Sequence, residues 1–192
     1  MEVEDYMGIP MKFKICLLGD YFVGKTSLIR RYVKNEFDEK YVMTIGTRTS
    51  KKDIVIKKPG IKDDFEITFI IWDIMGQYST RKLLHPTYLQ GADGAILVSD
   101  LTRRITLDHL DNWIDSVYSV RRVIPIVFIG NKSDLTDELE FGKSELDSMA
   151  SNYDSPFFTA SAKTGANVED AFRSLGEKII SDIVARDPSF RK

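Results

Sequence analysis

Residues 19–26 have the composition of a loop that wraps around a phosphate group. Their sequence, Gly-Asp-Tyr-Phe-Val-Gly-Lys-Thr, fits the pattern G-x-x-x-x-G-K-[ST]. Glycines let successive backbone N–H groups point inward at an anion, and a helix that follows contributes the positive end of its dipole. Lys25 supplies a charge for the outer phosphates, and the Thr26 hydroxyl can coordinate Mg²⁺. We expect the loop to bind a nucleoside triphosphate through Asp20, Tyr21, Phe22, Val23, Gly24, Lys25, Thr26 and Ser27.

A second motif, Asp-Ile-Met-Gly-Gln at residues 73–77, follows an apolar run that predicts a strand. Asp73 would stand at the carboxyl end of this strand, where α/β sheets bind ligands and where a carboxylate can hold a magnesium-bound water. The Gly76 N–H can reach a terminal phosphate, and Gln77 can orient an attacking water. We therefore expect Gln77, Lys25 and Gly76 to be the catalytic residues.

Two further motifs indicate the base. In Asn-Lys-Ser-Asp at residues 131–134, Asp134 offers two acceptor oxygens that match the N1–H and N2–H donors of guanine. Adenine lacks this pair of donors and would leave a charged acceptor unpaired, at a cost of about 1–3 kcal/mol or more. In Ser-Ala-Lys at residues 161–163, a backbone N–H can bond to the guanine O6. The expected base-binding residues are Asn131, Lys132, Asp134, Ser161, Ala162 and Lys163.

Each of the four motifs follows a predicted strand, so the strands decide how the motifs are placed. Apolar and β-rich runs predict strands over residues 13–18, 47–57, 65–72, 95–99, 124–129 and 157–160. Helices are predicted over residues 25–33, 79–89 and 142–152, around an apolar face at 110–117, and from Asn167, which is expected to be an N-cap. The faces that should be buried carry Leu110, Trp113, Ile114 and Val117, and Val168, Phe172, Leu175, Ile179 and Ile183.

The alternation of strands and helices predicts an α/β fold with parallel strands. Pro59-Gly60 is typical of a hairpin turn, so the two strands around it should be antiparallel. The expected fold is a P-loop NTPase with a six-stranded, mostly parallel sheet, one antiparallel edge strand and helices on both faces. We expect a flexible tail over residues 1–11, one domain over 12–185 and a short tail over 186–192.

The composition excludes several other functions. The 192 residues carry a net charge of −2, which gives no electrostatic reason to bind nucleic acid. The longest apolar run, residues 123–129, is far shorter than the ~18 residues of a membrane span. The acidic start of the chain has no secretory signal, and the single cysteine, Cys16, cannot form an internal disulfide. We expect a soluble, cytoplasmic monomer.

With these motifs, the chain resembles the Ras-like small GTPases, and most closely the Rab branch. The resemblance extends over residues 12–184 and includes GDYFVGKTS, WDIMGQ, GADGAILVSDLT, GNKSD and TASAKTG. It implies that GTP or GDP is bound with Mg²⁺, that Phe37 packs edge-on against the base and that Lys132 lies along it. It implies that Tyr41 folds over the phosphates, and that Thr44 contacts both Mg²⁺ and the γ-phosphate. The metal ligands would be Thr26, Thr44 and, through water, Asp73.

The resemblance also implies a molecular switch. Loss of the γ-phosphate would release Thr44 and Gly76, so that two loops relax together. Protein effectors would bind the ordered loops, and an exchange factor and an activating protein would control the cycle. The expected effector face is formed by Ile45, Gly46, Trp72 and Tyr88.

The sequence departs from the family at several positions. Tyr21 and Phe22 stand where the loop is usually small, and they could obstruct an arginine inserted by an activating protein. Thr49 takes the place of the third effector-binding aromatic residue of the Rab branch. The last residues contain no cysteine for prenylation, so we expect no direct lipid anchor.

Two other functions stay open at this point. The first is a guanine-nucleotide-binding scaffold with little or no hydrolysis, if Tyr21 and Phe22 spoil catalysis. The second is an adenine-using P-loop enzyme, against which Asp134 argues. Cys16 is expected to be a buried structural thiol, His109 to have no role in a metal site, and Arg103 to be a solvated residue at a helix end.

Overall fold

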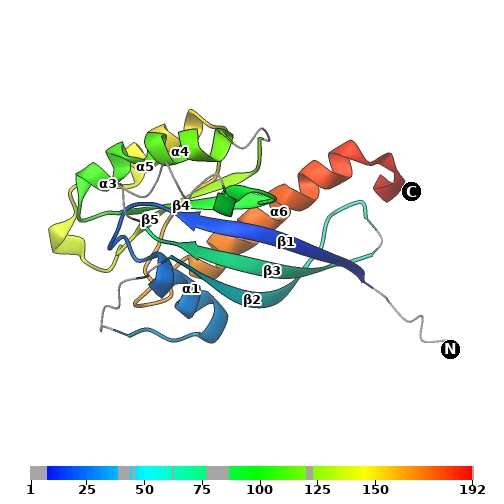
Figure 1. Ribbon diagram of the computed structural model, residues 1–192, viewed down its shortest axis with the longest axis horizontal. Helices are drawn as coiled ribbons and strands as arrows, with labels where there is room; N and C mark the ends of the chain where they lie inside the picture. The colour runs from blue at the N-terminus through cyan, green and yellow to red at the C-terminus, as the bar shows by residue number, and fades with distance from the viewer. Residues whose placement is uncertain are drawn as a thin grey trace.

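A six-stranded sheet forms the centre of the structure. The computed structural model describes residues 8–38, 44, 46–61, 63–76, 87–119 and 123–191. The strands lie in the order β2-β3-β1-β4-β5-β6, and all pairs are parallel except β2 with β3 (Figure 1). Their bounds are β1 (Ile9–Leu18), β2 (Thr47–Ile56), β3 (Phe65–Ile74), β4 (Gly94–Asp100), β5 (Ile126–Asn131) and β6 (Phe157–Thr159). The predicted fold class and the antiparallel edge strand are confirmed.

Helices cover both faces of the sheet. The α-helices are α1 (Lys25–Lys34), α3 (Arg104–Asp108), α4 (Leu110–Tyr118), α5 (Lys143–Ser151) and α6 (Val168–Arg186), with short 3₁₀ helices at η2 (Thr136–Glu138) and η3 (Pro188–Arg191). In Figure 1, α3, α4 and α5 lie on one side of the sheet, and α1 and α6 lie on the other. Most of the predicted helix over 79–89 lies outside the described residues, of which 87–89 are helical.

The sheet separates two apolar cores. Along β1, Ile15 and Leu17 point into the core shared with α1 and α6, whereas Cys16 and Leu18 point into the core shared with α3, α4 and α5. This alternation follows from the two-residue period of a strand. Strands β4 and β5 are buried at every position, as expected of parallel strands covered on both faces.

Two local predictions are wrong in part. Strand β1 begins at Ile9 and not at residue 13, because Ile9 to Leu17 pair with Phe65 to Asp73 of β3; the last three residues of the expected tail therefore belong to the sheet. Asn167 stands at the N-cap position of α6, where its carbonyl accepts from the Ala171 N–H, but its side chain makes no capping bond. Its backbone is left-handed, with φ 56°, and its side-chain amide donates to the Thr159 carbonyl at 2.7 Å.

The topology creates a crevice at one edge of the sheet. Strand β1 lies between β3 and β4. The connection after β1 runs toward β2 on one side of it, whereas the connection after β3 runs to β4 on the other side, and α/β sheets bind ligands at such a reversal. The carboxyl ends of β1, β3, β5 and β6 lead into the four motifs, at 19–26, 73–77, 131–134 and 161–163. Motifs that are far apart in the sequence thus meet at one place.

Phe172 offers a test of the core beneath α6. Its side chain is fully buried and stacks on Tyr32 with ring centroids 3.9 Å apart. We expect Phe172→Ala to lower the free energy of unfolding by about 3–5 kcal/mol, because it leaves a cavity. Urea denaturation measures this change. The control Glu177→Ala, on the exposed side of the same helix, should stay within about 0.5 kcal/mol of the wild type; equal effects would contradict the assigned core.

Candidate functional site

A cavity of about 680 Å³ lies at the carboxyl ends of the strands. Most of the residues that the sequence nominates line it: Tyr21, Phe22, Gly24, Lys25, Thr26, Ser27, Phe37, Thr44, Asp73, Gly76, Asn131, Lys132, Asp134, Ala162 and Lys163. Asp20, Val23 and Ser161 lie behind this lining. Tyr41, Ile45 and Gln77 lie outside the described residues.

The loop over residues 19–24 is shaped by its glycines and by Lys25. Gly19 and Gly24 have φ values of 139° and 96°, and a Cβ at Gly19 would collide with the Val98 carbonyl. The Lys25 ammonium group donates to the carbonyls of Gly19 and Asp20, both at 2.7 Å. Burial lowers the pKa of Lys25 to about 8, against the opposing effect of the Asp73 and Asp20 carboxylates. The loop thus holds a cation at the wall of the cavity.

Three oxygen atoms from separate elements meet beside this lysine. The Thr26 hydroxyl donates to Oδ2 of Asp73 at 2.5 Å and lies 3.0 Å from the Thr44 hydroxyl. Oδ1 of Asp73 is buried and has no hydrogen-bond partner among the described residues. Burial raises the pKa of Asp73, although the bonds from Thr26 and Thr44 and the charge of Lys25 oppose this. A carboxylate with an unpaired oxygen between two hydroxyls fits a hard cation such as Mg²⁺.

Gly76 lies very close to the phosphate-binding loop. A Cβ at this position would come within 2.5 Å of the Asp20 backbone and of the Lys25 ammonium group. Only glycine therefore allows the segment after β3 to approach the loop this closely, which places the Gly76 backbone at the wall of the cavity.

The base end of the cavity is joined to the phosphate end by Asn131. Its amide donates to the Val23 carbonyl at 2.8 Å, and its oxygen accepts from the Ala162 N–H at 3.1 Å. Nearby, the Ser161 hydroxyl donates to Oδ1 of Asp134 at 2.6 Å. Ser161 therefore lies behind the cavity and orients the carboxylate that lines it.

Comparison with known proteins agrees with this geometry. A family model described as "Ras family" matches residues 14–181. The chain belongs to the Ras family. It is also 35% identical to "Ras-related protein Rab-1" of Theileria annulata, over an alignment that covers 98% of this chain and 81% of the relative. As a Ras-family small GTPase, it belongs to the guanine-nucleotide switches, which bind GTP and GDP, usually with Mg²⁺, and hydrolyse GTP.

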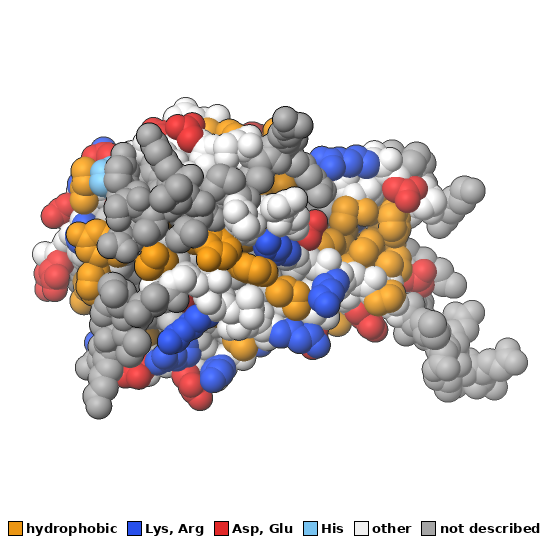
Figure 2. All heavy atoms as spheres, in the orientation of Figure 1, with side chains coloured by type: hydrophobic (Ala, Val, Ile, Leu, Met, Phe, Trp, Pro, Cys, Tyr) orange, Lys and Arg blue, Asp and Glu red, His pale blue; other side chains and the backbone are white. Residues whose placement is uncertain are grey.

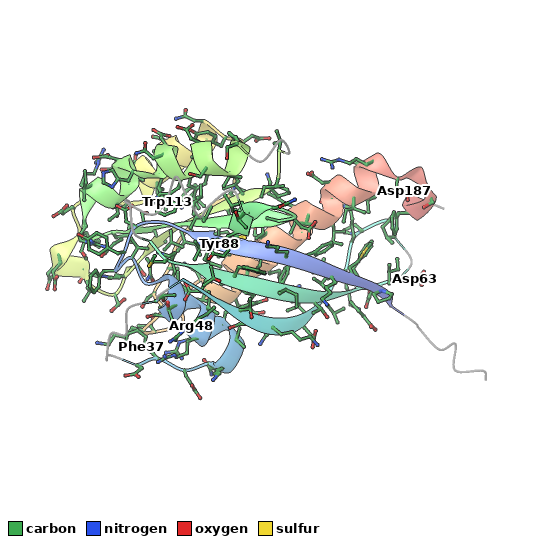
Figure 3. The ribbon with its side chains drawn as sticks, in the orientation of Figure 1. Phe37, Arg48, Asp63, Tyr88, Trp113 and Asp187 are labelled. Carbon is green, nitrogen blue, oxygen red and sulfur yellow. The ribbon has the colours of Figure 1, made fainter. Side chains whose placement is uncertain are left out.

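The structure of this GTPase adds cavity residues that sequence reasoning missed: Arg30, Asp38, Arg48, Ile74, Met75 and Leu135. Arg48 is the most consequential of them. It lies opposite Asp73 in the antiparallel register of β2 and β3, and opposite residues share one face of a sheet. Its charge lowers the pKa of Asp73, although burial raises that pKa by more. Figure 3 shows Arg48 on β2, on the same side of the molecule as Phe37.

Three residues, Asp20, His109 and Arg103, make contacts that the sequence did not indicate. Asp20 turns its carboxylate away from the cavity, where it accepts from the Trp113 indole at 2.9 Å and pairs with Nδ1 of His109 at 2.6 Å. His109 therefore contacts the phosphate-binding loop. Arg103 is not a solvated helix end, because it binds the buried Asp100 carboxylate and the Tyr21 carbonyl. Cys16 is buried as expected, and burial raises the pKa of its thiol to about 12.

The expected effector face is partly described. Trp72 and Tyr88 lie with ring centroids 6.3 Å apart, and the Lys14 ammonium group sits 4.1 Å from the Trp72 ring. Both aromatic residues are half-buried, as is Gly46. Figure 3 places Tyr88 in the middle of the view, and Figure 2 shows apolar side chains in a band across this face.

The described residues contain neither a cluster of His, Cys, Asp or Glu side chains that could hold a metal ion nor a membrane-spanning helix. No group of three or more His, Cys, Asp or Glu side chains in these ranges could hold a metal ion. Within the same ranges, every helix is too short or too polar to cross a bilayer.

Arg48→Gln tests the electrostatics of the metal site. Because a fixed positive charge repels a cation, removing it should lower the Mg²⁺ concentration that half-maximally slows GDP release, by about threefold or more. Release of a fluorescent GDP at graded free Mg²⁺ measures this. Lys51→Gln is the control, since Lys51 is exposed, pairs with Asp53 and lies on the other face of β2. An unchanged or higher Mg²⁺ requirement would contradict the effect ascribed to Arg48.

Proposed function

We propose that this Ras-family GTPase hydrolyses GTP slowly in a Mg²⁺-dependent reaction, and that effectors bind the loops that are ordered when GTP is bound. The proposal is carried by one observation: a single cavity brings together the phosphate-binding loop, the oxygen cluster of Thr26, Thr44 and Asp73, and the carboxylate of Asp134. These parts match the outer phosphates, the metal and the base of one nucleotide.

The phosphate end of the nucleotide would be held by the loop and by Lys25. The backbone N–H groups of Tyr21, Phe22, Val23, Gly24, Lys25, Thr26 and Ser27 would donate to phosphate oxygens. Thr26, Thr44 and, through water, Asp73 would hold Mg²⁺, which when bound neutralises charge on the outer phosphates. Gly76 would donate its N–H to the γ-phosphate, which the close approach of its backbone to Lys25 supports.

The base end would select guanine. Asp134 would accept from N1–H and N2–H, and the half-buried Phe37 and the stem of Lys132 would flank the ring. The bond from Ser161 fixes the orientation of the Asp134 carboxylate, and each of its two oxygens keeps a lone pair for one of the two base donors. The Ala162 N–H already binds Asn131, so among residues 161–163 the neighbouring Lys163 N–H is the donor we assign to O6.

Hydrolysis would depend on Gln77, which would orient the attacking water, and on Lys25 and Gly76, which would stabilise charge on the transferred phosphoryl group. A slow rate is supported by Arg103, which contacts the phosphate-binding loop but does not line the cavity, and so does not supply a charge to the transferred group. Its guanidinium is held by Asp100 and the Tyr21 carbonyl. An activating protein would then accelerate the reaction, an exchange factor would release GDP, and the similarity to a Rab protein supports a role in trafficking or signalling.

Base selection is tested by Asp134→Asn. The amide presents one donor and one acceptor in place of two acceptors, so it should weaken GDP binding by about 100-fold and favour xanthosine diphosphate, which offers a carbonyl where guanine has an amino group. Competition binding with both nucleotides measures the reversal. A mutant that keeps its full preference for guanine would show that Asp134 does not read the base.

Gln77→Leu separates a working GTPase from a nucleotide-binding scaffold. Without a side chain to orient water, single-turnover phosphate release should fall at least about tenfold while GTP affinity stays the same. If wild-type protein and Gln77→Leu release phosphate at the same background rate, the scaffold function is the correct one.

A further inference from the structure

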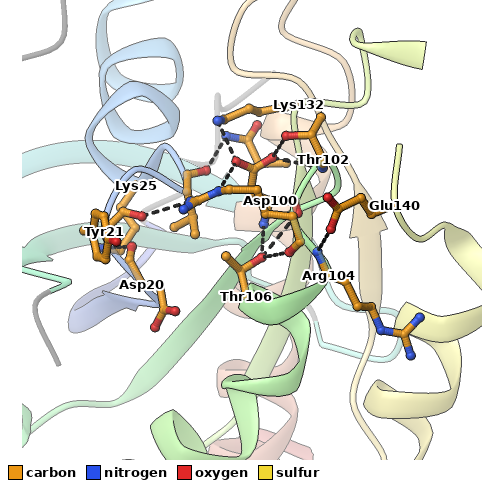
Figure 4. A network of polar contacts seen from close by, with 12 residues as sticks. Asp20, Tyr21, Lys25, Asp100, Thr102, Arg104, Thr106, Lys132 and Glu140 are labelled. Atoms are coloured by element: carbon orange, nitrogen blue, oxygen red, sulfur yellow. Dashed lines mark hydrogen bonds and ion pairs between the residues drawn. The ribbon is translucent and has the colours of Figure 1, made fainter. Parts of the chain in front are cut away.

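Asp100 ends β4 with a carboxylate that has no exposed surface and does not line the nucleotide cavity. Its Oδ2 binds the Lys132 ammonium group at 2.6 Å and Nε of Arg103 at 2.9 Å. Its Oδ1 accepts from the N–H and the hydroxyl of Thr102 at 3.1 and 2.8 Å. Figure 4 shows this network between β4, Lys132 and the phosphate-binding loop. Every oxygen of a buried charge is therefore satisfied.

Arg103 connects this carboxylate to the phosphate-binding loop. While Nε binds Asp100, Nη2 donates to the Tyr21 carbonyl at 2.9 Å. The centre of the guanidinium also lies 5.9 Å from the Tyr21 ring, within the range of a cation–π contact. A single planar group thus spans from the end of β4 to the loop, which a lysine could not do with the same geometry.

The contact with the Tyr21 carbonyl restrains the Tyr21–Phe22 peptide group, and with it the Phe22 N–H. A trans peptide is planar, so its C=O and N–H point in opposite directions. Arg103 lies outside the cavity lining and holds the Tyr21 carbonyl, and this turns the Phe22 N–H away from Arg103. Phe22 itself has φ 64°, a left-handed conformation that is costly for a bulky residue and must be maintained by its surroundings.

We propose that Arg103 is a positioning residue that holds the Tyr21–Phe22 peptide with its N–H toward the bound phosphates. Asp100 is the anchor that Arg103 shares with Lys132, so one buried carboxylate orients groups at both the phosphate end and the base end of the cavity. The inference rests on the proposed binding of guanine nucleotide in this cavity. It adds a residue that does not line the cavity but orients a peptide group that does.

Arg104 provides a matched control on the next residue. It carries the same charge, but it pairs with Asp108 at 3.4 Å and Glu145 at 3.5 Å, on the side of α3 and α5. Arg104→Gln and Arg103→Gln therefore remove the same charge from neighbouring positions, and only Arg103→Gln removes a contact with the loop. The Arg103 side chain is 31% exposed, so its substitution leaves no closed cavity in the core.

The experiment compares GDP with guanosine, which has the same base but no phosphate. Dissociation constants for both are measured by competition against a fluorescent GDP analogue at saturating Mg²⁺, with thermal unfolding recorded on the same samples. We expect Arg103→Gln to weaken GDP binding about tenfold, the effect of losing one well-oriented hydrogen bond, while its affinity for guanosine changes less than about twofold. Arg104→Gln should change both affinities by less than about twofold.

Three results would overturn the inference: an unchanged GDP affinity in Arg103→Gln, an equal loss in Arg104→Gln, or an equal loss of GDP and guanosine binding. The last two would indicate a general effect of charge or of fold stability. Failure of the proposed function is distinguishable, because the wild-type protein would then bind neither GDP nor guanosine with measurable preference over the adenine compounds.

Discussion

The burial of the Lys25 ammonium group is the constraint on which the arrangement of the site depends. A charge removed from water needs several compensating partners, and here they are the carbonyls of Gly19 and Asp20 together with the nearby Asp73 carboxylate. The loop can supply those carbonyls only by turning tightly, which requires the positive φ of Gly19 and Gly24. A cation held in this way, with N–H groups around it, is matched to a polyanion and to little else.

The remaining parts of the site are arranged outward from that loop by side chains that do not face the cavity. Asp20 ties it to α4 through Trp113 and His109, and Asn131 ties it to the segment after β6 through the Ala162 N–H. Buried hydrogen bonds of this kind are costly to leave unmade, so each restrains the position of the loop. Where the phosphate and the base are expected, the walls of the cavity are thus bonded to each other.

The parts of the fold and site that depend on local pattern could be predicted from the sequence. The phosphate-binding motif, the apolar strands and the Pro59-Gly60 turn specify where the cavity forms, because carboxyl ends of parallel strands share one edge. What could not be predicted depends on distant pairing. Polar Lys12, directly before the predicted strand, hid the early start of β1. The position of Arg48 follows only from the register of β2 and β3. Arg103 has the local sequence of an exposed helix end, and its contact with the buried Asp100 depends on the fold. Asn167 stands at the predicted N-cap position, but its side-chain amide donates to the Thr159 carbonyl of the preceding strand, and the side chain makes no bond to the helix.

The two borders of the sheet differ in a way that affects how the molecule behaves in a crowded solution. One border is the ten-residue β2, whose outer backbone groups could pair with a strand of another molecule. It carries Arg48, Lys51, Lys52 and Asp53, and Figure 2 shows blue side chains over this region. These charged side chains oppose the pairing of β2 with the edge strand of another copy. The opposite border, β6, has only three residues, too few to template an added strand. The architecture therefore resists aggregation at both borders without closing into a barrel.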